Sequence, residues 1–359
     1  MRFDLFHELA IPPMLPRTET ALFEETLAEL AAADTLGFDG AWLAEHHFMP
    51  GYSHSSKPEL VLAAAAARTR RLRLGLGVIP LPYHHPLHVA ERVATLDVLS
   101  RGRLEVGIGR GFSPPEYSAF GVRMEDSRPL VAESLALLRA SFSAAPVRFA
   151  GEHFRVEGVQ VVPGPVQRPH PPLWTAAVSP ETFDWAAREG LGVLVGPFKP
   201  WFMARADIGR YRAAWNHGHP PRVGMTLGTL CLRDGRRARE LSAPALTWFY
   251  GELLKVTRPV LETLYPSYEH FARLERFRKL VRLGPRPGLL AAAGMILVGD
   301  PGECIARIRK LERAGVTHLL CAMGAGALPT ALVHESLECM ANEVIPAFRD
   351  AGASEAAAP

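Results

Sequence analysis

The strongest constraint on the fold is the regular alternation of short apolar, β-branched segments with longer helical patterns. Strand-like segments recur eight times, and a helical pattern follows each of them. Such alternation produces right-handed βαβ units whose strands pair in parallel. Eight units predict an α/β fold in which the strands close into a (β/α)8 TIM barrel. The expected strands cover residues 2–7, 40–45, 73–78, 103–108, 172–176, 192–195, 223–231 and 318–321.

We expect residues 1–350 to form one barrel domain with two insertions that shape the substrate pocket. The first covers about residues 147–162, where the run from Phe149 to Phe154 is typical of a hairpin turn. The second covers about residues 256–294 and is longer and richer in proline than a barrel connection requires. A lid over the active site and an immobile helical elaboration are both compatible with this second segment. Residues 351–359 are expected to be a disordered tail.

The composition argues against several classes of function. The 40 basic and 37 acidic residues are interspersed, so nucleic-acid binding is not expected. Neither a signal-peptide pattern nor an apolar stretch of membrane-spanning length occurs, which predicts a cytoplasmic protein without a membrane partner. The four cysteines have no paired short spacing, which favours buried thiols over a zinc site or a disulfide framework. They are Cys231, Cys304, Cys321 and Cys339.

In a parallel barrel, the residues that follow the strands face one mouth, where active sites form. Glu45, His46 and His47 follow the second expected strand and are the candidate catalytic residues. Imidazole titrates near neutral pH and can therefore pass protons to or from a reacting centre. Adjacent side chains in an extended segment point to opposite sides, so at most one of the two histidines faces the chemistry, and His46 is the leading candidate. An adjacent histidine pair is also compatible with a purely structural role.

Basic and small residues at the same mouth predict an anion site. Arg110 and Gly111 follow the fourth strand, where glycine leaves backbone amides accessible. Arg128 follows Ser127, which is expected to cap the next helix and to hold Arg128 at its positive end. Each arginine taken alone is more often a surface or salt-bridged residue.

A second part of this anion site follows the fifth strand, in the run from Val178 to Thr182. Ser179 is expected to cap a helix whose first residue is Pro180, which leaves the next amides available to a phosphate. Helix-start chemistry alone also explains this motif. Its convergence with Arg110 and Arg128 at one barrel mouth favours a phosphorylated cofactor.

The third strand supplies glycines and the loop after it supplies histidines. Gly75 and Gly77 suit a flat ring lying against the main chain, or tight packing inside the barrel. A metal-dependent barrel hydrolase would use a histidine cluster, but this spacing without nearby carboxylates is a weak metal signal. We therefore assign no metal ligand. The three histidines of the loop region are His84, His85 and His88.

Four segments of the chain resemble the bacterial luciferase family: residues 36–48, 81–86, 100–111 and 120–128. The similarity is close over the first half of the chain and looser beyond it. It implies that His46 is the catalytic histidine beside the flavin. It further implies that Gly77 and Val78 form a cis peptide next to the flavin ring. The FMN phosphate is implied to lie against Arg110, Arg128, Ser179 and Thr182.

The same resemblance implies a monooxygenase that oxidises a small organic substrate with reduced FMN and O2 through a hydroperoxyflavin. A separate reductase is expected to supply the reduced FMN, since no dinucleotide-binding glycine motif follows the first strand. A homodimer is also implied. Gly109 and Val178 stand where the light-emitting α subunit has cysteine and glutamate, which disfavours light emission.

Two further interpretations stay within this superfamily. One is a deazaflavin-dependent hydride-transfer enzyme, which keeps the barrel and a phosphate site. Such enzymes commonly lack the Glu-His-His-Phe run found here at residues 45–48, so the run favours FMN. The other is a catalytically silent flavin-binding subunit.

Overall fold

The computed structural model describes residues 1–143, 145–264, 284–323 and 326–349, with backbone only for residues 258–264. The expected tail at residues 351–359 lies outside the described residues. So does the segment 265–283, which forms the middle of the second expected insertion.

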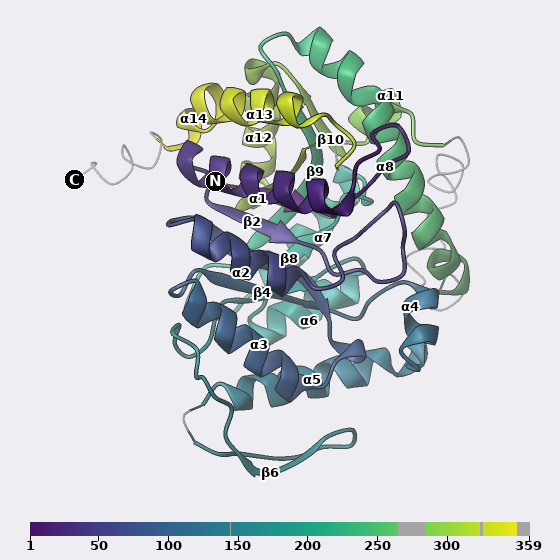
Figure 1. Cartoon of the computed structure of the whole chain (residues 1–359). Coiled ribbons are helices and arrows are strands. Elements are labelled where there is room, and N and C mark those ends of the chain that lie inside the picture. The colour runs from purple at the N-terminus through teal and green to yellow at the C-terminus, as the bar shows by residue number, and fades with distance from the viewer. Residues whose placement is uncertain (144, 265–283, 324–325, 350–359) are drawn as a thin grey trace, which may run out of the picture.

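Eight parallel strands close into a barrel surrounded by helices (Figure 1). Pairing between β8 and β9 completes the ring. The eight predicted strands are confirmed, with ends that differ from the prediction by at most two residues. They are β1 (Arg2–His7), β2 (Gly40–Leu43), β3 (Arg73–Pro80), β4 (Leu104–Gly109), β7 (Leu173–Ala176), β8 (Gly192–Val195), β9 (Val223–Cys231) and β11 (His318–Met323).

Helices cover the outside of the barrel (Figure 1). Gly37 adopts a left-handed conformation with φ of 86° and ends α1, as the Leu-Gly pair indicates. Among the described residues no helix is both long and apolar enough to cross a membrane. The main helices are α1 (Glu19–Leu36), α2 (Pro58–Arg68), α3 (Pro86–Leu99), α4 (Pro114–Ala119), α5 (Ser127–Ser141), α6 (Pro180–Glu189), α7 (Trp201–Ala214), α8 (Gly235–Leu264), α11 (Pro287–Ala292), α12 (Pro301–Arg313), α13 (Thr330–Cys339) and α14 (Pro346–Arg349).

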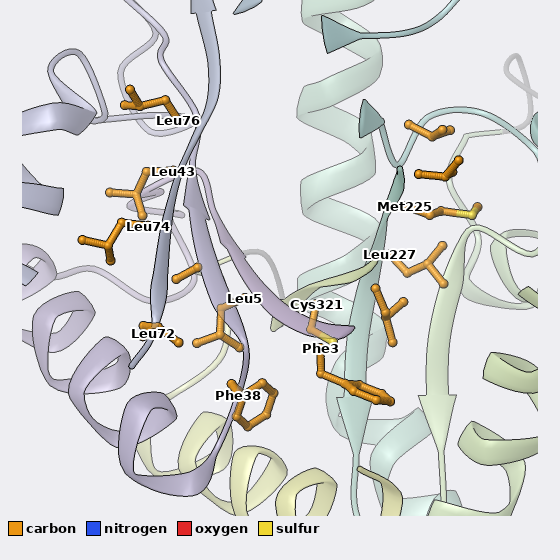
Figure 2. Close-up of a cluster of buried hydrophobic side chains, with 14 of the residues drawn as sticks. Phe3, Leu5, Phe38, Leu43, Leu72, Leu74, Leu76, Met225, Leu227 and Cys321 are labelled. Carbon is orange, nitrogen blue, oxygen red and sulfur yellow. The ribbon is translucent and has the colours of Figure 1, made fainter. Parts of the chain in front are cut away.

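The apolar side chains on the outer surface of the barrel pack against these helices. Figure 2 shows part of this layer, in which Leu5, Leu43 and Leu74 lie beside the strands of the N-terminal half and Leu227 beside β9. The four cysteines are buried and free, as predicted. Burial of this continuous layer supplies the main driving force for folding.

The interior of the barrel is filled at its amino-terminal end by two tryptophans. The rings of Trp42 and Trp174 meet edge to face at 5.3 Å. Their indole N–H groups donate to Asp4 Oδ2 at 2.9 Å and Glu105 Oε2 at 2.7 Å. Gly75 belongs to this layer, because a Cβ there would lie 2.2 Å from the Trp42 ring. Tight packing therefore explains Gly75.

The hairpin predicted within residues 147–162 is present as β5 (Val147–Ala150) and β6 (Arg155–Val159), which pair antiparallel. The Glu133 carboxylate of α5 accepts hydrogen bonds from the backbone N–H groups of Glu152, His153 and Phe154 and so fixes its turn. No residue of this hairpin lines the central cavity. The expectation that it shapes the substrate pocket is wrong, because the hairpin packs against α5 outside the barrel.

The second expected insertion begins inside a regular element. Residue 256 lies within α8, a helix of 30 residues, so the extra chain starts as a continuation of a barrel helix. An unpredicted strand, β10 (Ile296–Gly299), follows α11. β9 is longer than β8. β8 pairs with the first part of β9, Val223–Met225, and β10 pairs with its last part, Gly228–Cys231.

Candidate active site

A cavity of about 550 Å³ lies at the mouth formed by the carboxyl ends of the strands. Its floor is apolar and contains Phe6, Val78, Leu194 and Leu320, which pack with the two tryptophans below. The helix α8 contributes to one wall through residues 253, 254 and 257. Aromatic side chains form much of the remaining wall, namely Tyr52, Phe112, Trp185 and Phe198.

The structure brings nearly all of the predicted site residues to this one cavity. Two of the three candidate catalytic residues line it, Glu45 and His46, whereas His47 does not. All eight candidate cofactor residues line it as well. These are Gly77, Val78, Arg110, Gly111, Arg128, Val178, Ser179 and Thr182.

The peptide bond between Gly77 and Val78 is cis, as the resemblance implied. The pairing of β3 with β4 is irregular between Leu76 and Ile79, where this bond lies. Glycines on β4 make room for the Val78 side chain. A Cβ at Gly107 or Gly109 would lie 2.8 Å or 2.6 Å from a Val78 methyl group. The absence of side chains at these two positions therefore sets the shape of this wall of the cavity.

His46 lies between two buried carboxylates. Its Nε2 is 3.5 Å from Glu8 Oε2 and its Nδ1 is 3.5 Å from Glu116 Oε1. The rings of Phe112 and Tyr52 pack against the imidazole at 5.2 Å and 5.8 Å. Burial disfavours the charged imidazole, but the nearby carboxylates outweigh this effect and raise the pKa of His46.

His47 points away from His46, as expected for adjacent side chains in an extended segment. Its Nε2 and the His84 Nε2 both lie within hydrogen-bond distance of Glu45 Oε1, at 3.0 Å and 2.5 Å. Burial opposes the charge on Glu45, but these two hydrogen bonds prevail and lower the pKa of Glu45 to about 2. The backbone N–H of His47 donates to Glu116 Oε1 at 2.7 Å. This network fixes the segment that carries His46.

The three histidines considered for a metal site have separate partners. His84 is bonded to Glu45, and the His85 Nδ1 accepts from the Leu87 backbone N–H at 3.2 Å at the start of α3. The exposed His88 lies 3.3 Å from Glu91. These three imidazoles therefore do not converge on one point. His84 lies instead with His47 and Glu45, and one ligand atom from each of these three residues lies within 4.8 Å of the others, so this group, which the sequence did not indicate, could hold a metal ion.

Arg110 is one of three arginines that line the cavity, together with Arg128 and Arg188. Within the described parts of the chain its guanidinium has neither an ion-pair nor a hydrogen-bond partner. The Tyr117 hydroxyl donates to the Arg110 carbonyl oxygen and fixes the backbone. Gly111 follows with φ of 76°, and a Cβ there would lie 2.4 Å from the Tyr83 hydroxyl. Glycine is required here both by the backbone conformation and by the close contact.

The start of α6 faces the same cavity. Ser179 is its N-cap and Pro180 its first residue, as predicted. The Ser179 side chain does not cap the helix, and its Oγ lies 3.2 Å from Thr182 Oγ1 instead. The helix therefore presents two hydroxyls at the positively polarised end of its dipole.

The expected cap at Ser127 is wrong. Ser127 is the first residue of α5, and its hydroxyl donates to the Met124 carbonyl at 2.6 Å rather than accepting from a helix N–H. A short helical turn at Met124–Asp126 precedes α5 and offers this carbonyl as a closer partner. Arg128 still lies in the first turn of α5 and lines the cavity.

Sequence reasoning missed three buried charged residues of the site. Glu8 follows β1 directly, and Lys199 follows β8 within a few residues, so the rule used for the other strands would have found both. Lys199 Nζ donates to the Val178 carbonyl at 2.6 Å and pairs with Asp207, and burial lowers the pKa of this amine despite the Asp207 carboxylate. Glu116 lies on α4, and nothing in its local sequence indicates that it reaches His46.

The chain matches the family model for luciferase-like monooxygenases over residues 1–318. The uncharacterized protein y4wF of Sinorhizobium fredii is 43% identical over 173 residues, which cover 48% of this chain and 50% of that protein. Limonene 1,2-monooxygenase of Rhodococcus erythropolis is 30% identical over 88% of this chain and 79% of that protein. The oxygenase component of flavin-dependent trigonelline monooxygenase of Acinetobacter baylyi is 25% identical over 98% of this chain and 96% of that protein.

Solved structures share the whole fold. The monooxygenase RslO1 of Streptomyces bottropensis superposes with a TM-score of 0.82 at 28% identity, covering 97% of this chain and 100% of that chain. The oxygenating constituent of 3,6-diketocamphane monooxygenase of Pseudomonas putida, in complex with FMN, superposes with a TM-score of 0.73 at 20% identity. The match covers 96% of this chain and 98% of that chain. An F420-dependent secondary alcohol dehydrogenase superposes with a TM-score of 0.71 at 19% identity, covering 97% of this chain and 99% of that chain. The same fold therefore occurs with FMN in one of these neighbours and with F420 in another, and the fold alone does not indicate a cofactor.

Proposed function

The chain belongs to the luciferase-like monooxygenase family, and we propose that it uses reduced FMN and O2 to oxygenate a small organic substrate. A separate reductase supplies the reduced FMN in this proposal. The name of the trigonelline relative, an oxygenase component, supports such a division of labour. The family resemblance also implies a homodimer, and the sequence pattern predicts a cytoplasmic protein; we include both in the proposal.

One observation carries the proposal: His46 and the residues that we propose as an anion site line the same largely apolar cavity. Arg110 is without a partner in the described structure, and Ser179 and Thr182 present hydroxyls at a helix start. A phosphate would meet a guanidinium and the positive end of a helix dipole at once. Gly77 and Val78 line the same cavity, and the flat ring of the cofactor would lie against this wall.

These residues fit FMN, and they form two groups that would hold different parts of it. Arg110, Arg128, Ser179 and Thr182 would hold the phosphate, while the Gly77–Val78 wall would support the ring. When bound, reduced FMN would supply two electrons, so that one oxygen atom of O2 enters the substrate and the other leaves as water.

The protein's own contribution is proton transfer and exclusion of water. His46 holds a proton on its imidazole at the cavity wall and can donate or accept one there. Phe112 and Tyr52 cover this imidazole, and the apolar floor leaves few groups that retain water. A dry site prevents reduced flavin and oxygen from being spent on hydrogen peroxide.

We propose that the protein does not emit light. Gly109 and Val178 both line the cavity at the two positions where the light-emitting α subunit differs. The Val78 side chain, from the neighbouring strand β3, occupies the space beside Gly109, so a larger side chain at Gly109 would displace it.

Anaerobic binding measurements test the cofactor assignment. Reduced FMN and reduced F420 are each titrated into the purified full chain, and the metal content of the same sample is measured. We expect saturable binding of reduced FMN and much weaker binding of F420. Tighter binding of F420 would indicate the hydride-transfer alternative, and stoichiometric metal without flavin binding would contradict the whole proposal.

A further inference from the structure

His46 is enclosed by acidic groups from three separate elements. Glu8 follows β1, Glu45 follows β2, and Glu116 lies on α4. The carboxylates of Glu8 and Glu116 lie 3.5 Å from the two different ring nitrogens of His46, Nε2 and Nδ1 respectively. Both carboxylates are buried, with 7% and 1% of their residue surface exposed. The imidazole therefore has an acidic partner on each side.

This geometry distinguishes the two protonation states of the ring. A neutral imidazole has one N–H group and one nitrogen lone pair, so one of its nitrogens would direct a lone pair at a carboxylate oxygen. The imidazolium has an N–H group on each nitrogen, so each nitrogen would turn a proton toward the carboxylate that lies 3.5 Å away. The electrostatic interaction with two carboxylates at this distance also favours the positive charge.

Other groups hold the two carboxylates in place. The Tyr52 hydroxyl donates to Glu8 Oε1 at 3.3 Å. The His47 backbone N–H donates to Glu116 Oε1 at 2.7 Å, and the Tyr83 hydroxyl donates to Glu116 Oε2 at 3.4 Å. The acceptor positions are thus fixed independently of His46. Burial raises the pKa of Glu8, which the His46 charge and the Tyr52 hydrogen bond oppose.

We propose that Glu8 and Glu116 are positioning residues that hold His46 as an imidazolium, so that His46 serves the reaction as a proton donor and not as a base. The donor role rests on the proposed function, whereas the charge state does not. One O–H bond forms on the oxygen being reduced as one imidazolium N–H bond breaks, whether that oxygen leaves as water or, without substrate, in hydrogen peroxide. The electron pair of that bond stays on the nitrogen, and solvent returns the proton to the ring. When water forms, its second proton would be supplied by the bound reduced flavin.

The charge state is measured directly by NMR on the flavin-free full chain with ¹⁵N-labelled histidine. The His46 signal is assigned by its loss in His46→Gln. We expect a His46 pKa above the ordinary histidine value, lowered by about 1 pH unit or more in Glu8→Gln and in Glu116→Gln. Glu91→Gln, which changes the exposed partner of His88 on α3, is the matched control and should leave the His46 titration unchanged.

Aspartate variants separate the charge from the fold. Glu8→Asp and Glu116→Asp keep the carboxylate while retracting it, so the His46 pKa should fall less than in the glutamine variants. They also provide the measurement if a glutamine variant fails to fold. A His46 pKa at or below the ordinary value, or one that neither carboxylate changes, would overturn the proposal.

The pH dependence of reduced-FMN reoxidation tests the donor role. His46 is charged below its pKa, so a donor is active at low pH and is lost as the pH rises through that value. The glutamine variants should move this alkaline limb to lower pH in step with the NMR titration. A rate that instead rises with pH through the His46 pKa would show that His46 acts as a base. If the NMR shifts appear but reduced FMN fails to bind, the proposed function is wrong and the charge-holding role stands.

Discussion

Substituting Arg110 by alanine should separate FMN from riboflavin, which lacks the phosphate. Arg110 is half-buried at the cavity wall and has no partner in the described structure, so an incoming phosphate would not have to displace another anion. A hydrogen bond to a charged group contributes about 1.5–3 kcal/mol. At about 1.4 kcal/mol for each factor of ten, Arg110→Ala should weaken FMN binding by about 10- to 150-fold.

The assay is equilibrium titration of reduced FMN and reduced riboflavin under nitrogen, with wild type and variant side by side. Riboflavin affinity should change by less than about threefold, because its ring meets the Gly77–Val78 wall in either protein. Arg123→Ala is the control: this arginine is exposed, pairs with Glu125 at 2.9 Å and does not line the cavity. An equal loss of affinity for both flavins in Arg110→Ala would refute the phosphate role.

Three predictions concern stability. Gly75→Ala should lower the free energy of unfolding by about 2 kcal/mol or more in urea titrations, because its Cβ would lie 2.2 Å from the buried Trp42 ring. Gly209→Ala, in open space within α7, should raise it by about 0.5–1 kcal/mol, and a similar loss in both variants would contradict the packing argument. Burial raises the pKa of Asp4 from 3.8 to about 7, so its contribution is present below pH 3.8 and is lost as the pH rises toward 7. Asp4→Asn should therefore gain stability relative to wild type over this range, by about 4 kcal/mol at most, and a difference independent of pH would show that Asp4 is ionised in the fold.

The sequence predicted the barrel well because each strand is a short apolar run bounded by helix-stop signals. The same regularity located the mouth, since residues directly after a strand must lie there. His46, Arg110 and Ser179 were found in this way, and Glu8 was available to the same rule.

Two features depended on contacts between distant segments. Glu116 reaches the His46 segment from α4, 69 residues after His47, and only the folded chain shows this contact. β10 pairs with the part of β9 that extends beyond β8. The short apolar run of β10 does not by itself indicate that β9 is longer than β8. The role of the 147–162 hairpin was misjudged for a related reason. The length of this segment indicates an insertion. Its position outside the barrel depends on contacts with α5, where the Glu133 carboxylate accepts from the His153 backbone N–H.

The choice between Ser127 and the preceding turn was decided by local geometry. A serine before a helical pattern is typical of an N-cap, but a carbonyl three residues upstream was within its reach. Competition between such neighbouring partners is not visible in a linear pattern. The same applies to Ser179, whose hydroxyl lies beside Thr182 rather than capping α6.

Rapid mixing of the protein–reduced FMN complex with O2 tests the central claim most directly. The account predicts that flavin reoxidation occurs in two resolved steps, with delayed release of hydrogen peroxide in the absence of substrate. In His46→Gln the rate of the second step should change, while the affinity for reduced FMN is retained. Reoxidation in a single step at the rate of free reduced FMN, with immediate hydrogen peroxide, would contradict a monooxygenase function for this cavity.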